Sequence, residues 1–250
     1  MPAMRADGLA GRLAIVTGAL GNLGPVWSSA LAGEGMTVVG VDVRPPTNST
    51  ARVEQADVRD RDSLHRVLEL VLGEYETPSV LVNNAGIDSP PVPGRGEEEV
   101  SFSETLDVNL VGVFNATEVF GAAMRDAGRG SIVNIGSLYA SVAPEPSFYD
   151  HLDPPFVKPA AYGASKAGVV SLTRYFARLW GPYGVRVNAL SPGGVLVAQD
   201  EEFKRKYSAR VPLGRMAERD DLVGPLVFLA SDASSYVNGH ELRVDGGFTA

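Results

Sequence analysis

A short apolar run followed by three spaced glycines constrains the fold of this chain more than any other feature. Residues 13–17 read LAIVT, which indicates a buried strand, and a helical pattern over 22–34 follows. Between them, glycines let a backbone approach a phosphate closely, and the start of a helix offers unpaired amides. The arrangement predicts a strand, turn and helix that hold a dinucleotide pyrophosphate, the alternative being a tight packing turn. The residues assigned to this cradle are Gly18, Leu20, Gly21, Asn22, Leu23 and Gly24.

The rest of the chain continues to alternate short strands with longer helices. Strands are expected over residues 37–43, 80–83, 131–136, 185–190 and 241–244. Helices are expected over residues 62–73, 103–127, 160–180 and 220–231. Such alternation implies parallel strands joined by right-handed crossovers. We therefore predict an α/β fold, with a Rossmann-like doubly wound parallel sheet flanked by helices, in a single domain over residues 1–250.

Three irregular segments, 87–101, 138–159 and 193–215, follow predicted strand ends. The ligand crevice of a doubly wound sheet lies at the carboxyl ends of its strands, so these segments should border it. Long irregular segments in a compact domain are usually functional or disordered. We interpret all three as loops that border a substrate cleft.

Composition excludes several classes of function. The chain has no cysteine and only three scattered histidines, which argues against a metal site. A net charge of -8 argues against a nucleic-acid-binding surface. No apolar run is long enough for a membrane helix, and no signal peptide is evident, so we expect a cytoplasmic protein without a membrane partner.

Asp42 ends the second predicted strand, 18 residues beyond Gly24. A carboxylate there can accept hydrogen bonds from both adenosine ribose hydroxyls, and it repels a 2′-phosphate. The position therefore predicts NAD rather than NADP. Arg44, two residues further on, is the competing signal, because a guanidinium could turn toward a phosphate.

Tyr162 and Lys166 lie four residues apart, so on a helix they share one face. Moving a tyrosine pKa from about 10 to about 7 requires about 4 kcal/mol. One positive charge at about 4 Å supplies about that much at an effective dielectric near 20. The pair is a candidate general acid/base, although the same spacing also occurs by chance on solvated helix faces.

A series of further motifs runs along the chain in a fixed order. They are the Thr17-Gly18 glycine turn, Asn83-Asn84-Ala85-Gly86, Asn109, Ser137, Tyr162 with Lys166, Ser191-Pro192-Gly193 and Asp245-Gly246-Gly247. In this order they resemble the short-chain dehydrogenase/reductase family, in its compact single-domain branch, over essentially the full length. The resemblance implies hydride transfer between C4 of a nicotinamide and a carbonyl or secondary alcohol carbon.

The same resemblance assigns roles to individual residues. Tyr162 would exchange a proton with the substrate oxygen, and Ser137 would hydrogen-bond that oxygen. Lys166 would lower the pKa of the tyrosine and hold the nicotinamide ribose, while Asn109 would anchor a water for proton exchange. The residues expected along the cofactor are Asn84, Ala85 and Gly86 on the adenosine side, Asp57 and Val58 near the adenine, and Pro192, Gly193 and Val195 beside the nicotinamide.

The chain also departs from the family pattern. Its glycine spacing, TGxxGxxG, resembles longer members that act on nucleotide-linked sugars rather than the TGxxxGxG of compact members. Val197 stands where many members have a hydroxyl side chain. The interval from Ser137 to Tyr162 is longer than in most members and forms a polar insertion at the substrate end. With Pro192-Gly193-Gly194 and residues 200–207, it resembles a subgroup linked to sialic-acid-like and other surface sugar pathways.

Taken together, these features predict an NAD-dependent oxidoreductase acting on a polar small molecule, a sugar or sugar derivative in particular. A 3-ketoacyl-type reductase and a non-catalytic NAD-sensing regulator are the alternatives. The insertion could equally be a surface elaboration or a subunit contact. Family resemblance implies a homotetramer or homodimer, and residues 169–180 have apolar side chains to spare for it.

Overall fold

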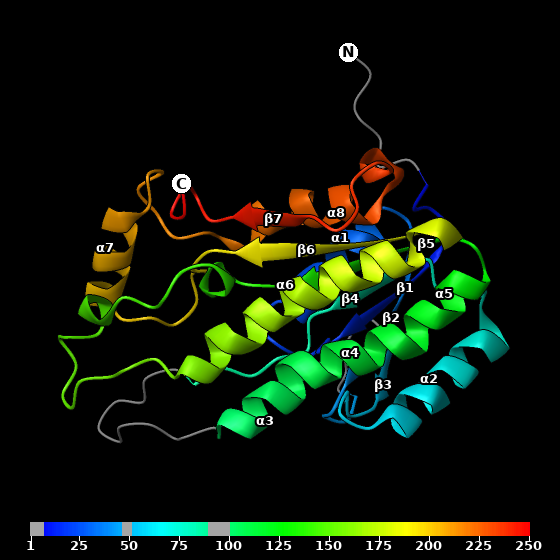
Figure 1. Ribbon diagram of the computed structural model, residues 1–250, viewed down its shortest axis with the longest axis horizontal. Helices are drawn as coiled ribbons and strands as arrows, with labels where there is room; N and C mark the ends of the chain where they lie inside the picture. The colour runs from blue at the N-terminus through cyan, green and yellow to red at the C-terminus, as the bar shows by residue number, and fades with distance from the viewer. Residues whose placement is uncertain (1–7, 47–51, 90–100) are drawn as a thin grey trace, which may run out of the picture.

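The computed structural model describes residues 8–46, 52–89 and 101–250. Seven parallel strands form one sheet in the order β3-β2-β1-β4-β5-β6-β7 (Figure 1). The strands are β1 (Leu13–Thr17), β2 (Thr37–Asp42), β3 (Arg52–Gln55), β4 (Val80–Asn83), β5 (Gly130–Ile135), β6 (Val185–Pro192) and β7 (Glu241–Val244). The strand order reverses between β1 and β4, and ligands bind at such a switch point in open α/β sheets. The predicted Rossmann-like sheet is confirmed.

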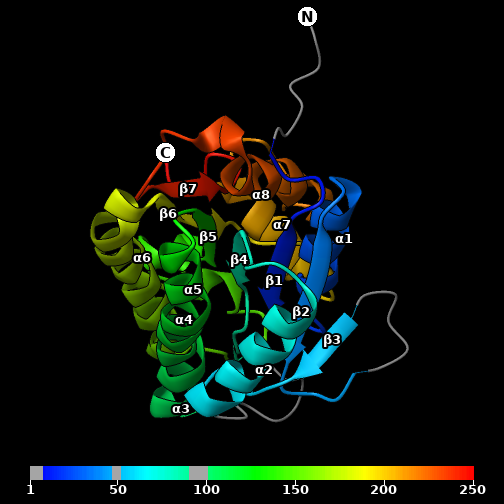
Figure 2. The same cartoon turned by 90° about the vertical axis from the view of Figure 1, so that its right-hand side faces the viewer.

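Successive residues of β1 point to opposite faces of the sheet and so seed two apolar layers. Leu13 and Ile15 join one buried cluster, while Ala14 and Val16 join the other. Helices α1 (Gly24–Gly33) and α8 (Val223–Ala230) cover the second layer (Figure 2). Helices α2 (Arg61–Glu74) and α6 (Ala160–Trp180) cover the first, with a long helix between them.

That long helix runs over 102–126 and contains two π turns. Its segments are α3 (Phe102–Leu106), a π turn (Asp107–Val111), α4 (Gly112–Ala116), a second π turn (Thr117–Gly121) and α5 (Ala122–Asp126). The helix itself was predicted, but apolar periodicity does not distinguish these turns from an ordinary helix. Such turns are rare and are frequent at functional sites.

Two elements differ from the sequence-based expectation. Strand β3 lies in a segment for which no strand was predicted. The prediction of a loop over 193–215 was wrong in part, because α7 (Glu201–Arg210) lies within it. Asp200 caps this helix by accepting a hydrogen bond from the Phe203 amide at 2.8 Å. Of the loop predicted at 87–101, residues 90–100 lie outside the described part of the chain.

Helix α7 and the insertion at 138–159 pack together as a third apolar cluster. Its buried members are Leu138, Phe148, Tyr149, Phe156, Phe203, Tyr207, Val211 and Met216. Ion pairs join the same two segments, including Arg210 with Glu145 at 3.3 Å and His151 with Asp200 at 2.8 Å. Residues on both sides of the interface are therefore held over the carboxyl end of the sheet. Within the described ranges, no helix is long and apolar enough to cross a membrane.

Candidate active site

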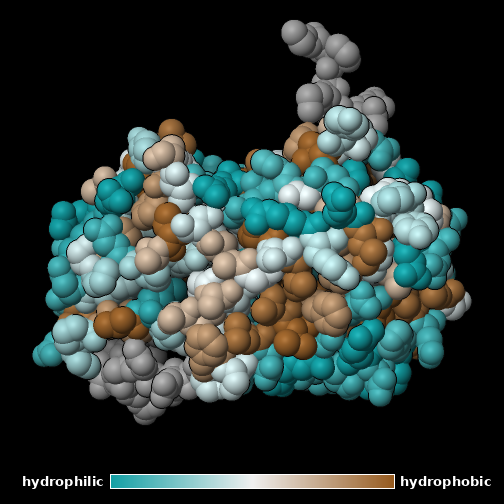
Figure 3. All heavy atoms as spheres, in the orientation of Figure 1, coloured by the Kyte–Doolittle hydropathy of each residue, from teal (hydrophilic) through white to brown (hydrophobic). Residues whose placement is uncertain are grey.

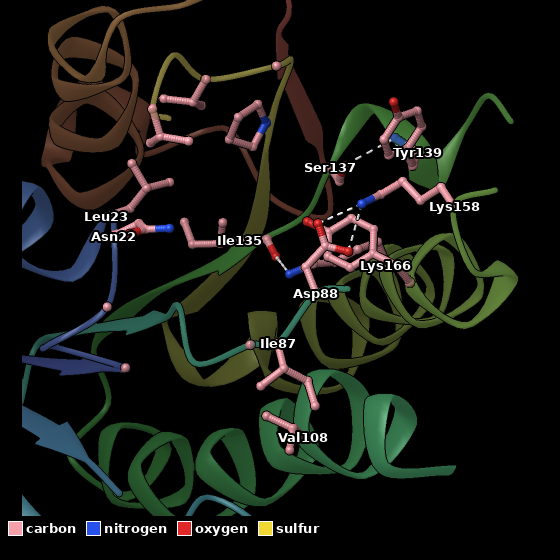
Figure 4. A pocket seen from close by; sticks show the side chains of 18 of the residues that line it. Asn22, Leu23, Ile87, Asp88, Val108, Ile135, Ser137, Tyr139, Lys158 and Lys166 are labelled. Carbon is pink, nitrogen blue, oxygen red and sulfur yellow. Dashed lines mark hydrogen bonds and ion pairs between the residues drawn. The ribbon is translucent and has the colours of Figure 1, made fainter. Parts of the chain in front are cut away.

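A cavity of about 1570 Å³ opens along the carboxyl edge of the sheet, from the glycine turn to the insertion (Figure 4). Most of the residues predicted to form the site line it. They are Gly18, Gly21, Asn22, Leu23, Asp42, Asp57, Val58, Asn84, Ala85, Gly86, Ser137, Tyr162, Lys166, Pro192, Gly193 and Val195. Three others, Leu20, Gly24 and Asn109, do not line the cavity and lie behind its wall. All three predicted loops contribute wall residues through their described parts.

The glycine turn has no room for side chains. Gly18 has a φ of +63°, and a Cβ on it would lie 2.7 Å from the Cα of Ala85. A Cβ on Gly24 would lie 2.3 Å from the carbonyl oxygen of Gly18. The turn therefore presents bare backbone at the start of α1, which fits the pyrophosphate of a pyridine dinucleotide.

Asn84 braces this turn from the end of β4. Its side-chain amide donates to the carbonyls of Thr17 and Gly18 at 3.1 and 2.9 Å. Its Oδ1 accepts from the Trp27 indole of α1 at 2.7 Å. The side chain is thus occupied within the protein, and the backbone that follows it, at Ala85 and Gly86, forms the cavity wall.

Asp42 closes the adenosine end and is almost fully buried. Its carboxylate accepts hydrogen bonds from the Leu20 amide at 2.9 Å and from the amide and Nε of Arg44, each at 3.0 Å. Burial raises the pKa of Asp42, but the hydrogen bonds from Arg44 and Leu20 outweigh burial and leave it below its ordinary value. The carboxylate is therefore charged at neutral pH, and it holds the side chain of Arg44.

Asp57 and Val58 form the next part of the wall. The carboxylate of Asp57 pairs with Arg59 at 2.6 Å. The carbonyl of Val58 accepts from the Asn115 side chain at 3.0 Å, and a Cβ on Gly112 would touch the Val58 side chain at 2.5 Å. The long helix thus fixes the backbone at the predicted adenine position.

The first π turn places Asn109 against the strand-end loop, with no exposed surface. Its Oδ1 accepts from the Ile87 amide at 2.7 Å, and its Nδ2 donates to the Ile87 carbonyl at 2.9 Å. A Cβ on Gly86 would approach Asn109 Oδ1 at 3.3 Å and Lys166 Nζ at 3.7 Å. Asn109 therefore fixes the loop that faces Lys166.

Ser137, Tyr162 and Lys166 meet at the centre of the cavity. The ammonium of Lys166 donates to the Ile135 carbonyl at 2.8 Å and lies 5.7 Å from the centroid of the Tyr162 ring. Burial lowers the pKa of Lys166 to about 8. Burial, followed by the charge of Asp88, raises the pKa of Tyr162, while its hydrogen bond with Ser137 acts in the opposite direction.

Burial has the largest influence on the pKa of Tyr162 and raises it. The expected lowering of this pKa by Lys166 stays a prediction. That expectation assumes two groups about 4 Å apart at an effective dielectric near 20. In the structure the phenol is buried, and burial disfavours its charged form.

Two wall residues beside Tyr162, Lys158 and Asp88, were given no catalytic or cofactor role, although the polar insertion that carries Lys158 was expected at the substrate end. Lys158 of the insertion donates to both carboxylate oxygens of Asp88 at 2.7 Å, as Figure 4 shows. Its ammonium lies 5.1 Å from the ring centroid of Tyr162 and 6.0 Å from that of Tyr139.

The predicted nicotinamide end is equally crowded. A Cβ on Gly193 would lie 2.9 Å from the Cα of Asp245, and one on Gly194 would lie 2.6 Å from the Tyr207 ring. The Tyr207 hydroxyl accepts from the Gly194 amide, so α7 supports this backbone directly.

Comparison with known proteins places the chain among dehydrogenases. The family model described as enoyl-(acyl carrier protein) reductase matches residues 18–249. The cis-4-hydroxycyclohexanecarboxylate dehydrogenase of Sinomonas cyclohexanicum is 33% identical, over 98% of this chain and 99% of that protein. The 3-oxoacyl-[acyl-carrier-protein] reductase FabG of Thermotoga maritima is also 33% identical, over 96% and 98%. The D-threitol dehydrogenase of Mycolicibacterium smegmatis is 34% identical, over 96% and 94%.

Two solved structures with bound cofactors superpose over nearly the whole chain. A short-chain dehydrogenase from Leptospira borgpetersenii with bound NAD+ has a TM-score of 0.87 at 32% identity, covering 98% of this chain and 95% of that one. A gluconate 5-dehydrogenase from Burkholderia cenocepacia, in complex with NADP and tartrate, has a TM-score of 0.84 at 30% identity, covering 98% of both chains.

Proposed function

The chain belongs to the short-chain dehydrogenase/reductase family, and from that premise we propose that it oxidises a secondary alcohol of a sugar or sugar derivative, or reduces the matching ketone. It is an oxidoreductase acting on CH–OH groups with a pyridine nucleotide cofactor. The observation that carries the sugar proposal is the polar wall next to Tyr162. There the insertion contributes Lys158, Tyr149 and His151 and the loop after β4 contributes Asp88, so the wall offers hydrogen-bonding groups to a polyhydroxylated ligand.

We propose NAD as the preferred cofactor. The charged carboxylate of Asp42 lies at the end of β2, where ribose hydroxyls would donate to it. Arg44 is held by that carboxylate, which opposes its use for a 2′-phosphate. Measured dissociation constants for NADH and NADPH test this preference, and tighter binding of NADPH would contradict it.

A bound nicotinamide would supply the hydride acceptor or donor of the proposed reaction. Tyr162 exchanges the proton with the substrate oxygen, and the Ser137 hydroxyl hydrogen-bonds the same oxygen. The ammonium of Lys166 lies 5.7 Å from the ring centroid of Tyr162, beside the end of β5, where it would bind the cofactor ribose and stabilise the phenolate. Asn109 keeps the loop at Gly86 and Ile87 in position beside Lys166.

The test is NADH formation or consumption with a panel of alditols, aldoses, ketoses and sugar acids. Tyr162→Phe should abolish turnover while NADH still binds. Tyr183→Phe is the matched control, because Tyr183 lies in the turn after α6, its side chain is exposed and it does not line the cavity. Retention of most of the turnover by Tyr162→Phe would refute the proposed proton transfer.

An acyl-thioester ketoreductase is the second candidate, since the Thermotoga relative is named for that activity. A panel that includes a 3-ketoacyl thioester separates the two, because preference for the thioester would replace the sugar proposal. A protein that binds NADH and turns over no member of the panel would instead support the sensing regulator.

We propose a homotetramer or homodimer that pairs the faces carrying α4 and α6. Apolar side chains gather on this face (Figure 3), and Phe102, Val111, Tyr175 and Leu179 are exposed there. Sedimentation of the wild type and of Leu179→Glu measures the oligomeric state. A wild type that sediments only as a monomer would exclude the assembly. The cytoplasmic location and the sialic-acid-like subgroup stay predictions.

A further inference from the structure

In two acid–base pairs on the cavity wall, one partner is more exposed than the other. In the pair of Lys158 with Asp88, the lysine side chain is 7% exposed and the aspartate 41%. In the pair of His151 with Asp200, the histidine is 21% exposed and the aspartate 46%. All four residues line the cavity. In both pairs, therefore, the basic side chain is the more buried partner and the carboxylate the more accessible one.

In the first pair, it is the carboxylate that has hydrogen-bonding capacity left for a ligand. Lys158 spends two donors on the oxygens of Asp88, and its ammonium otherwise faces the rings of Tyr162 and Tyr139. Asp88 Oδ1 also accepts from the Ser89 amide at 2.9 Å. An ionised carboxylate has about four acceptor positions, so after these three hydrogen bonds Asp88 retains an acceptor on Oδ2. A ligand that reaches this wall beside Tyr162 meets acceptors, which bind hydroxyl donors.

We propose that Asp88, held in place by Lys158, binds hydroxyl groups of the substrate next to the reacting carbon, and that this wall selects uncharged polyols and their ketoses over sugar acids. The inference rests on the proposed function and narrows its substrate class. It makes Asp88 a specificity-determining residue of the insertion-facing wall.

The charges around the substrate end agree with this selection. Among the described residues that line it, the carboxylates are Asp88, Asp153 and Asp200. The facing cations are Lys158 and Lys166, together with His151 when protonated, and Lys166 is bonded to the Ile135 carbonyl. A substrate carboxylate would have to compete with Asp88 for Lys158. It would also lie near the negative charges of Asp153 and Asp200, and this repulsion disfavours a sugar acid.

Matched substrates test the inference directly. The substrates are an alditol and the sugar acid of the same chain length, such as D-threitol with D-threonate or D-glucitol with D-gluconate. The measurement is kcat/KM for NAD reduction with each substrate. The ratio of alditol to acid is taken for the pair that reacts faster. For the wild type we expect kcat/KM for the alditol to exceed kcat/KM for the acid by about tenfold or more, because the site binds hydroxyl groups and repels a negative charge. Asp88→Asn keeps the shape and removes the charge, so the ratio should fall at least about tenfold, mainly through KM for the alditol.

Asp126→Asn is the control, because it removes a carboxylate paired with Arg125 at the end of α5, outside the cavity. It should leave the ratio unchanged. NADH binding by Asp88→Asn, followed by fluorescence, verifies that the variant is folded. Preference of the wild type for the acid, or an unchanged ratio in Asp88→Asn, would overturn the inference and leave the proposed function standing. Absence of turnover with every pair and with the wider sugar panel would overturn both.

Discussion

Lys158 lies over the ring of Tyr162, with its ammonium 5.1 Å from the ring centroid. That is closer than the 5.7 Å to the ammonium of Lys166, the lysine that the family pattern singles out. The phenol is therefore flanked by two ammonium groups, one from the insertion and one from α6. Since Asp88 neutralises the first, the insertion controls the charge felt by the acid/base as well as the shape of the cleft.

Replacing Lys158 should shift the pH dependence of alcohol oxidation. Lys158→Met leaves the charge of Asp88 unpaired beside Tyr162, so the phenol should lose its proton at a pH higher by about one unit. Asp88→Asn should move it in the opposite direction. The other groups that face the phenol are Lys166, Ser137 and Tyr139, and they are unchanged in both variants.

The measurement is the pH profile of kcat/KM for NAD reduction. Oxidation requires the deprotonated phenol, so the rising limb should move upward for Lys158→Met and downward for Asp88→Asn. Lys204→Met is the control, since Lys204 pairs with Glu201 on α7 at 2.7 Å and does not line the cavity. Equal profiles for all four proteins would show that the pair does not act on Tyr162.

Much of this site follows from local sequence patterns. The glycine turn was predictable because strand, glycines and helix are adjacent in the chain. Six of the seven strands were predictable because each of their apolar runs is short and bounded by turn residues; β3 was missed. Asp42 was identified by its distance from the glycines. These features depend on neighbours in sequence, so no knowledge of tertiary packing is required.

The missed features depend on distant partners. Lys158 precedes Tyr162 by four residues, but α6 begins only at Ala160, so helical spacing does not place the lysine. Asp88 comes from the loop that follows β4, 70 residues away in the chain. Helix α7 was read as a charged loop, although Phe203 and Tyr207 are spaced for one buried helical face.

The buried ammonium of Lys166 should make stability rise with pH in the protein without cofactor. Burial lowers its pKa from 10.5 to about 8 in the folded state. Below pH 8 the charged ammonium therefore lowers the free energy of unfolding by about 3 kcal/mol. This destabilisation disappears as the pH rises from about 8 to about 10.5. The unfolding free energy of the wild type minus that of Lys166→Met should rise by about 2 kcal/mol between pH 7 and 9.5.

Urea denaturation at the two pH values measures this difference. The subtraction matters because burial also raises the pKa of several tyrosines, Tyr162 among them, which lowers stability only above about pH 10. A difference that stays constant with pH would mean that Lys166 is not desolvated in the free protein.

Glycine substitutions should separate the cofactor cradle from the rest of α1. Gly18→Ala places a methyl group against the Ala85 backbone at a positive φ, so NADH binding should weaken by about tenfold or more. Gly33→Ala is the matched control, because a Cβ there meets nothing within 4 Å. It should leave NADH binding unchanged and raise stability by up to about 1 kcal/mol. Equal NADH affinity in the two variants would argue against the cradle.

Asp42 should determine the choice between NAD and NADP by holding Arg44. Asp42→Ala removes the acceptor for ribose hydroxyls and frees a guanidinium whose side chain is already 56% exposed. NADH binding should weaken and NADPH binding should strengthen, changing their ratio by about a hundredfold, since each charge-assisted contact is worth about 1.5–3 kcal/mol.

The double variant Asp42→Ala/Arg44→Ala distinguishes the two effects. It should keep the loss of NADH affinity, because the carboxylate is still missing, and lose the gain for NADPH, because the guanidinium is gone. Dissociation constants from fluorescence titration at one ionic strength make the comparison, since screening would otherwise weaken the phosphate contact. If the single and double variants bind NADPH equally well, Arg44 does not contact the phosphate, and Asp42 selects NAD by repulsion alone.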